Sequence, residues 1–190
     1  MKRSILTGFL LSVIAHMQAQ SQVQIPLKQR LQLEYTIFPM GQIFPCTFTI
    51  DTTAEGSMVI AWVNELGRGG RIIMTRTALD TGSIGYWGPP AYGEDIVLDD
   101  NQTVLLLSKK QWAELQRYGR VNYDGLFYTQ KAASGENQVM IDDKPADAIL
   151  LQSESSEARI WILNNPALPL LLKVENNPVG VDLKIERVKQ

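Results

Sequence analysis

Apolar and polar side chains alternate with a period of two along several stretches of this chain. Residues 31–37, 46–50 and 181–185 each place an apolar side chain at every second position, with Gln, Glu, Thr, Asp or Lys between. Strict alternation buries one side of a strand and leaves the other in water, which is typical of antiparallel sheets. Shorter β-rich runs lie at residues 58–63, 71–75, 103–107, 126–129, 139–141, 148–152, 159–163 and 170–175.

Turn-forming residues separate these runs. Gly, Pro, Asn or Ser mark residues 39–41, 55–56, 67–70, 134–137, 153–157 and 176–178. Spacings of about 10–14 residues leave no room for helical crossovers, so hairpin connections are expected. The pattern predicts a mainly β fold with a curved antiparallel sheet, half-barrel-like, in one domain over residues 20–190.

One segment, residues 109–118, has the pattern of a helix. Ser108 and Gln111 form a Ser-x-x-Gln capping box, and Gly119 is suited to end the helix. Trp112 and Leu115 fall on one side of it. A helix of about three turns is not stable alone in water, so we expect this side to pack on the sheet.

Residues 80–101 form a long segment rich in Gly and Pro that also carries Tyr86, Trp87 and Tyr92. Long loops within a compact domain are often functional, so these three aromatics are candidate ligand-binding residues. Trp112 and Trp161 are further candidates for the lining of a concave sheet face. For all five side chains, simple packing in the core is the alternative.

The first residues have the layout of a secretory signal peptide. Lys2 and Arg3 precede an apolar stretch over residues 5–14, and Ala19 or Ser21 offers a small residue for cleavage. Residues 1–19 are therefore predicted to be removed on export, which places the protein in the periplasm or outside the cell. The apolar stretch is shorter than the roughly 20 residues that cross a bilayer, and no transmembrane segment is expected in the mature chain.

Removal of the signal peptide changes the chemistry of the chain. It takes away His16, the only histidine, and two of the 18 basic residues, which leaves a net charge of −4 against 20 acidic residues. Catalysis that uses a histidine base is then excluded, and the usual metal sites lose their commonest ligand. No basic stretch suggests a nucleic-acid partner, and no cofactor or metal is expected.

Cys46 is the only cysteine, so no intramolecular disulfide can form. In an oxidising compartment an exposed thiol is a hazard, and we expect Cys46 to be buried and inert.

An enzymatic alternative comes from residues 80–83, whose Asp-Thr-Gly-Ser pattern is that of aspartic proteases. This chemistry needs two carboxylates that share a proton. The pattern occurs once, so the second aspartate would have to come from a homodimer, with Asp80 as the catalytic residue. The apolar segment that should follow is missing, and a polar turn is the alternative explanation.

Two segments together resemble a known group of proteins. They are residues 86–128, from Tyr-Trp-Gly-Pro-Pro to Tyr128, and residues 159–183, which contain Arg-Ile-Trp-Ile-Leu-Asn-Asn-Pro. Both are similar to functionally uncharacterised secreted β-rich proteins of Bacteroidetes-type bacteria. The second segment is more distantly similar to LolA-like periplasmic proteins. That resemblance implies an open half-barrel closed by helices and, by analogy of shape, the carriage of lipid.

The sequence favours a non-enzymatic binding module that holds an apolar ligand, such as a lipid, or an envelope partner. The homodimeric protease and a structural protein of the envelope remain alternatives.

Overall fold

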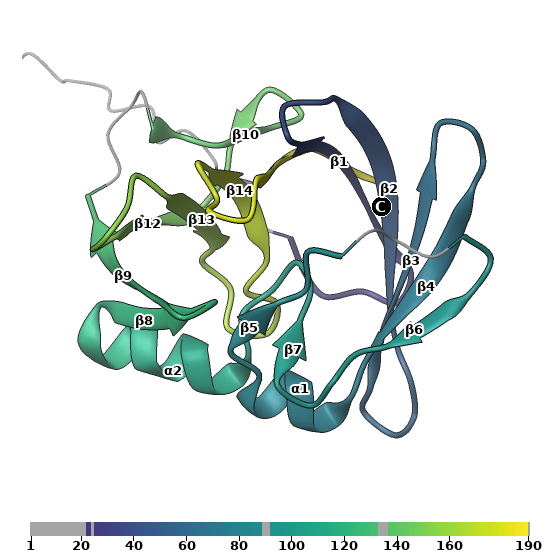
Figure 1. Ribbon diagram of the computed structural model, residues 1–190, viewed down its shortest axis with the longest axis horizontal. Helices are drawn as coiled ribbons and strands as arrows, with labels where there is room; N and C mark the ends of the chain where they lie inside the picture. Colours follow the sequence, from purple (N-terminus) through teal and green to yellow (C-terminus); the bar gives the residue numbers. More distant parts are fainter. Residues whose placement is uncertain (1–21, 24, 89–91, 133–136, 190) are drawn as a thin grey trace, which may run out of the picture.

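The computed structural model describes residues 22–23, 25–88, 92–132 and 137–189. The described residues are built around one large mixed sheet, with strand order β6-β4-β3-β2-β1-β15-β14-β13-β12-β9-β8. Its strands are β1 (Leu31–Pro39), β2 (Phe44–Thr52), β3 (Met58–Asn64), β4 (Gly69–Met74), β6 (Asp95–Val97), β8 (Arg120–Tyr123), β9 (Leu126–Lys131), β12 (Ala148–Ser153), β13 (Arg159–Leu163), β14 (Leu171–Glu175) and β15 (Val181–Lys189). The sheet curls strongly without closing into a barrel (Figure 1), so the predicted mainly β fold with a curved, half-barrel-like sheet is confirmed.

Two short pairs and two helices complete the described part of the fold. The pairs are β5 (Ile84–Gly85) with β7 (Gln102–Thr103) and β10 (Met140–Ile141) with β11 (Lys144–Pro145); the helices are α1 (Arg76–Thr81) and α2 (Lys109–Tyr118). Both helices lie side by side along one edge of the molecule (Figure 1). In this described part, no helix has the length and apolar character needed to cross a bilayer.

The prediction of hairpin connections throughout was wrong at one edge of the sheet. Strand β6 pairs with β4 in parallel, as β5 does with β7. The chain between β4 and β6 contains α1 and β5, so residues 80–101 are not one continuous loop. The sequence signal for these strands was weak because each is only two or three residues long.

The alternating strands at the centre of the sheet behave as predicted. Strand β1 pairs with both β2 and β15, and its Leu31, Leu33 and Tyr35 are buried while the residues between them are partly exposed. The phenol of Tyr35 donates a hydrogen bond to the Leu171 carbonyl oxygen, 2.9 Å away. This contact connects β1 to a strand that is distant in sequence.

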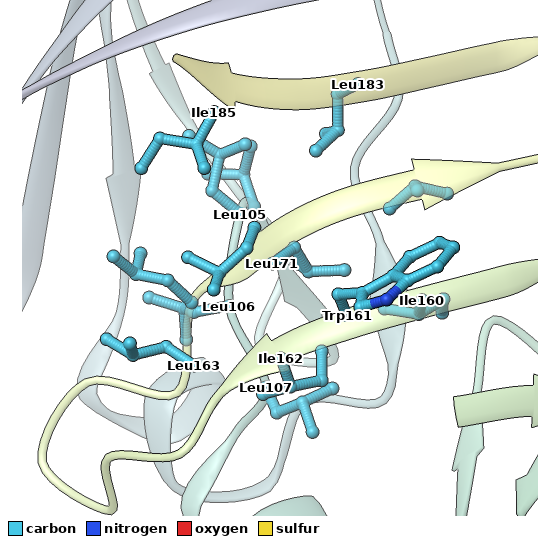
Figure 2. Close-up of a cluster of buried hydrophobic side chains, with 14 of the residues drawn as sticks. Leu105, Leu106, Leu107, Ile160, Trp161, Ile162, Leu163, Leu171, Leu183 and Ile185 are labelled. Atoms are coloured by element: carbon cyan, nitrogen blue, oxygen red, sulfur yellow. The ribbon is translucent and has the colours of Figure 1, made fainter. Parts of the chain in front are cut away.

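Strand β13 from Ile160 onward and the start of β14 are buried on both sides, and their leucines and isoleucines form the centre of the core (Figure 2). The predicted strand at residues 103–107 was wrong beyond Thr103, because the chain turns at Leu105, which has a φ of 60°. Beyond the turn, the Leu105 carbonyl accepts from the Leu171 N–H at 2.8 Å, so this apolar run pairs irregularly with the start of β14.

Helix α2 has the predicted bounds. The Ser108 hydroxyl accepts from the Gln111 N–H, the Gln111 side chain accepts from the Ser108 N–H, and Gly119 ends the helix with a φ of 61°. Helix α1 was missed; its N-cap is Thr75, whose hydroxyl accepts from the Ala78 N–H. A helix of six residues carries too short an apolar pattern to stand out in a sequence. The predicted signal peptide, residues 1–19, lies outside the described residues.

Candidate functional site

A cavity of about 410 Å³ lies between the inner face of the curled sheet and the segment around Tyr86 and Trp87. Its lining comprises Ile37, Pro39, Phe44, Cys46, Phe48, Trp62, Ile72, Tyr86, Trp87, Gly88, Tyr92, Val104, Leu105, Tyr123, Val181 and Leu183. Seven of these side chains are aromatic and none is charged. We call this cavity the aromatic pocket.

The sheet supplies one wall through inward-facing positions of neighbouring strands. Phe44, Cys46 and Phe48 are alternate residues of β2, and Phe48 lies opposite Trp62 of β3. Because successive side chains of a strand point to opposite faces, this spacing brings all four to the same side. The alternating pattern that predicts the strands therefore also builds the pocket wall.

The second wall is held in place by hydrogen bonds from the turn between β8 and β9. In this turn Asp124 accepts from the Trp87 indole N–H at 2.6 Å and from the Gly85 N–H at 3.3 Å. The Trp87 ring also meets Tyr123 edge-on, with ring centroids 6.4 Å apart. Trp87 is thus fixed both through its nitrogen and through its ring.

Gly85 is required by this close packing. A Cβ at this position would lie 2.5 Å from the Trp87 Nε1 and 2.6 Å from the Tyr123 hydroxyl. Any larger residue would displace one of the two aromatic rings.

Tyr92 stands at the mouth of the pocket. Its ring lies 5.5 Å from that of Trp62, tilted by 53°, and the Arg68 guanidinium lies 5.9 Å from its centroid. Tyr92 is 56% exposed as a residue, so it contacts Trp62 while much of its surface faces water.

The turns next to the mouth expose apolar side chains. Met40 and Ile43 lie between β1 and β2, Leu66 between β3 and β4, and Val179 between β14 and β15. The Met40 N–H donates to the Gly180 carbonyl oxygen at 2.7 Å, which joins two of these turns. Met40, Ile43 and Val179 thus expose apolar surface close in sequence to the pocket-lining residues Pro39, Phe44 and Val181.

The pocket is strongly apolar, and burial keeps two of its titratable groups, Cys46 and Tyr123, in the neutral form. Burial raises the pKa of the Cys46 thiol to about 12. Burial, followed by the nearby Asp124 charge, also raises the pKa of the Tyr123 phenol. Both groups stay protonated at neutral pH, so neither provides a base or an anionic nucleophile.

Two other hollows flank the aromatic pocket. A smaller one of about 190 Å³ shares Trp87 and Tyr123 with it, which makes these rings the partition between the two. An open groove of about 730 Å³ is lined by polar and charged residues of both signs, including Glu34, Asp142 and Lys184. Among the described residues, no group of three or more His, Cys, Asp or Glu side chains is placed to hold a metal ion.

The five aromatic residues singled out from the sequence divide into two sets. Tyr86, Trp87 and Tyr92 lie together in the pocket lining. Trp112 is half-buried on α2 and Trp161 is fully buried in β13, and neither lines the pocket.

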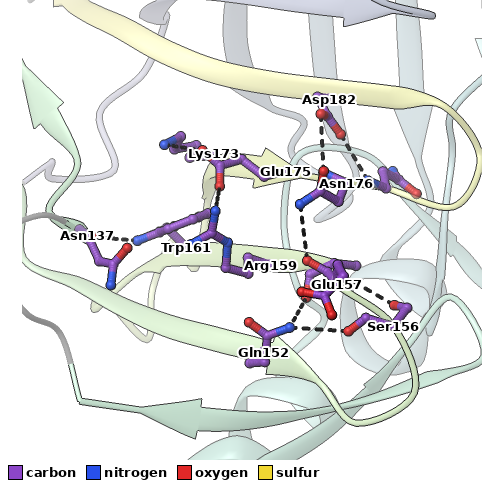
Figure 3. Close-up of polar contacts among 12 residues, drawn as sticks. Asn137, Gln152, Ser156, Glu157, Arg159, Trp161, Lys173, Glu175, Asn176 and Asp182 are labelled. Atoms are coloured by element: carbon purple, nitrogen blue, oxygen red, sulfur yellow. Dashed lines mark hydrogen bonds and ion pairs between the residues drawn. The ribbon is translucent and has the colours of Figure 1, made fainter.

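Trp161 packs among polar partners on a different part of the sheet (Figure 3). Its indole N–H donates to the Asn137 carbonyl oxygen at 2.7 Å, and the Arg159 and Lys173 cations lie 5.4 and 4.7 Å from the centroid of its ring. Glu175 forms ion pairs with both cations. These contacts explain the position of Trp161 by packing and hydrogen bonding within the fold.

Sequence reasoning missed Trp62, Phe44 and Phe48 as pocket residues. Their alternation in β2 and β3 is visible in the sequence, but a strand pattern does not distinguish residues that line a cavity from those that fill a core.

Asp80, the alternative catalytic residue, lies in α1 and is partly exposed. It accepts a hydrogen bond from the Lys109 ammonium at 2.7 Å and lies 3.9 Å from the Arg76 guanidinium. The Lys109 hydrogen bond, more than the charges of Lys109 and Arg76, lowers the pKa of this carboxyl. A protease dyad needs one carboxyl to retain its proton at working pH, whereas these cations favour the ionised form.

Comparisons with protein-family models, with curated proteins and with solved structures find no match to this chain. The resemblance to secreted β-rich and LolA-like proteins therefore stays a prediction.

Proposed function

We propose that this protein is a non-enzymatic binding module that holds an apolar small molecule in the aromatic pocket. The observation that carries the proposal is a cavity of about 410 Å³ whose lining contains no charged side chain. Ligand pockets in proteins are typically about 300–1,000 Å³ in volume and mostly apolar, with a few polar groups.

The energetics favour an apolar occupant. A molecule that buries about 250 Å² of apolar surface gains roughly 6 kcal/mol before the costs of association are subtracted. A charged molecule would lose its hydration without finding an opposite charge in the lining.

The chemistry of the lining supports binding over catalysis. Its titratable groups are one thiol and the tyrosine phenols, and the thiol pKa of about 12 keeps Cys46 protonated at neutral pH. General acid–base catalysis works best with a group whose pKa lies near the working pH.

The proposal extends to location and partner class. Residues 1–19 have the layout of a signal peptide, so the module acts after export, in the periplasm or outside the cell. A lipid or another apolar molecule of the envelope is the proposed ligand, which is what the predicted resemblance of the sequence to LolA-like proteins implies.

The test is binding of the neutral fluorescent probe N-phenyl-1-naphthylamine to the protein and to two matched variants. Val181 lines the pocket, whereas Val97 is exposed on β6 and does not. Val181→Glu places a carboxylate in the apolar lining, and we expect it to weaken probe binding about tenfold or more. Val97→Glu should bind the probe as the unaltered protein does.

Two results would count against the proposal: no probe uptake by the unaltered protein, or equal loss of binding in both variants. Native mass spectrometry of the protein isolated from its host provides a second measurement, because a bound apolar molecule appears as a defined added mass.

A further inference from the structure

Trp62 has a buried hydrogen-bond donor without a partner. The residue is 3% exposed in β3, and its Nε1 makes no hydrogen bond within the described part of the chain. Trp87 and Trp161, in contrast, donate from Nε1 at 2.6 and 2.7 Å. Buried polar groups are almost always paired, so an unpaired indole N–H beside a cavity needs an explanation.

The position of Trp62 supplies that explanation. Its side chain lines the aromatic pocket beside its cross-strand neighbour Phe48, and it packs under the ring of Tyr92. An indole N–H can only donate, so the partner it lacks is an acceptor. An oxygen atom on the pocket's occupant would satisfy it.

We propose that the occupant of the aromatic pocket is an uncharged, ring-containing molecule with an acceptor oxygen that receives the Trp62 indole hydrogen bond. This inference rests on the proposed binding function and names the class of ligand for the same pocket. A ketone, ester or ether oxygen on an apolar ring system has the required chemistry.

We infer an uncharged occupant because the pocket lining contains no charged side chain. A carboxylate or phosphate could also accept from Trp62, but no Lys or Arg side chain lines the pocket to balance its charge. The Arg68 guanidinium lies beyond the mouth, over the ring of Tyr92. An anion at Trp62 would therefore be buried with a single neutral donor.

The ring character follows from the seven aromatic side chains in the lining. Flat rings offer edges and faces that pair well with other rings, which adds to the gain from apolar burial.

Because the Trp62 nitrogen is covered in the structure, the acceptor reaches it only when a neighbour moves. Tyr92, whose ring contacts Trp62 while the residue is more than half exposed, is the neighbour with room to move.

The experiment compares three probes of nearly equal shape: 2-acetylnaphthalene, which has a ketone oxygen; 2-ethylnaphthalene, which has none; and 2-naphthoate, which is an anion. The chain has four tryptophans, so ¹⁵N-labelled protein gives four indole N–H signals, which Trp→Phe variants assign. We expect the ketone to bind roughly 5- to 20-fold more tightly than the hydrocarbon. Only the ketone should move the Trp62 indole proton downfield, and the naphthoate should bind most weakly.

Trp62→Phe removes the N–H and keeps an aromatic ring. It should bring the ratio of ketone to hydrocarbon affinity to about one, because the change in apolar contact from the smaller ring acts on both probes alike. Equal binding of ketone and hydrocarbon to the unaltered protein would overturn this inference and leave the proposed function standing. Tightest binding of the naphthoate would contradict both this inference and the apolar occupant of the proposed function. Failure of all three probes to bind would overturn both.

Discussion

The Cys46 thiol shows how burial in the pocket wall disfavours a charged group. Cys46 lies in the pocket wall, 5% exposed, and burial raises the pKa of its thiol to about 12. A thiol in an unfolded chain has a pKa of about 8.5 and is partly ionised at slightly alkaline pH. The expectation from sequence that Cys46 is buried is confirmed, and the raised pKa gives a physical reason for it to be inert.

We predict that Cys46 in the folded protein reacts with a disulfide reagent such as Ellman's at least about 1,000-fold more slowly than in the urea-unfolded protein at about pH 8. The thiolate is the reactive form, and a shift of about three pKa units reduces its fraction by that factor. Absorbance of the released thiol reports the rate. Rapid labelling of the folded protein would show that the pocket wall is open at Cys46.

Asp124 is a second residue whose role can be isolated. Its carboxylate holds the Trp87 indole at 2.6 Å, and its backbone has a φ of 56°. We predict that Asp124→Asn lowers the free energy of unfolding by about 1–2 kcal/mol, because a charge-assisted hydrogen bond becomes a neutral one. The looser Trp87 should also weaken binding of the naphthylamine probe.

Asp143 offers the matched control for Asp124. It is exposed in the turn between β10 and β11 with a φ of 60°, and Asn tolerates that backbone conformation equally well. Urea titration of Asp143→Asn should give a midpoint unchanged from that of the unaltered protein. If the two variants are equally stable, the Trp87 contact contributes nothing measurable.

At the scale of elements, the sequence predicted a strand or helix correctly where a pattern of neighbouring residues determines it. Alternation predicted β1, β2 and β15, and the capping box gave α2 its bounds of Lys109–Tyr118. Where the prediction from sequence failed, contacts between distant parts of the chain determined the local structure. Residues 104–107 are all apolar, which suggested a strand, yet the chain turns at Leu105 and the run pairs irregularly with the start of β14.

The candidate site shows the same limit. Tyr86, Trp87 and Tyr92 stood out because aromatic residues in a segment rich in Gly and Pro are conspicuous. Trp62 did not, because inward-facing strand residues look alike whether they fill a core or line a cavity. The distinction depends on what lies opposite, here a segment more than 20 residues further along the chain.

Helix α2 provides a test at this scale. Beyond the capping box, Gln111 donates from its amide to the Asn122 carbonyl oxygen at 2.8 Å, which joins the start of the helix to β8. We predict that Ser108→Ala lowers the free energy of unfolding by about 1–2 kcal/mol, since the Gln111 N–H loses its acceptor and Ser108 is fully buried.

Thermal or urea unfolding followed by circular dichroism measures the effect of Ser108→Ala. Lys110→Ala, on the exposed side of the same helix, is the control and should stay within about 0.5 kcal/mol of the unaltered protein. Equal stability of the two variants would mean that the first turn of α2 frays without loss to the fold.

At the scale of the whole molecule, the curled sheet buries several ionisable groups in neutral form. Burial raises the pKa of the Tyr128 phenol to about 12, as it does that of the Cys46 thiol. Burial also raises the pKa of Tyr35 and, together with the Asp124 charge, that of Tyr123. All four groups lie in or next to the sheet that forms the pocket, so their protonation is linked to folding.

The sign of this linkage is definite. In the unfolded chain the thiol ionises near pH 8.5 and the phenols near pH 10, whereas in the folded protein all four keep their protons to higher pH. The unfolded state therefore binds fewer protons than the folded state as pH rises above about 9, and stability falls with pH. The stabilisation is complete below about pH 8 and is lost progressively toward about pH 12.

We accordingly predict that the urea midpoint is level between about pH 7 and 8 and drops steeply by about pH 10.5. Tyr128→Phe cannot ionise, so this variant should lose less stability over the same range than the unaltered protein does. Phenolate absorbance near 295 nm, followed with urea unfolding, would show ionisation and unfolding occurring together. Phenols that all titrate near pH 10 while the fold stays intact would mean that the inner face of the sheet admits water, and an apolar pocket could not persist there.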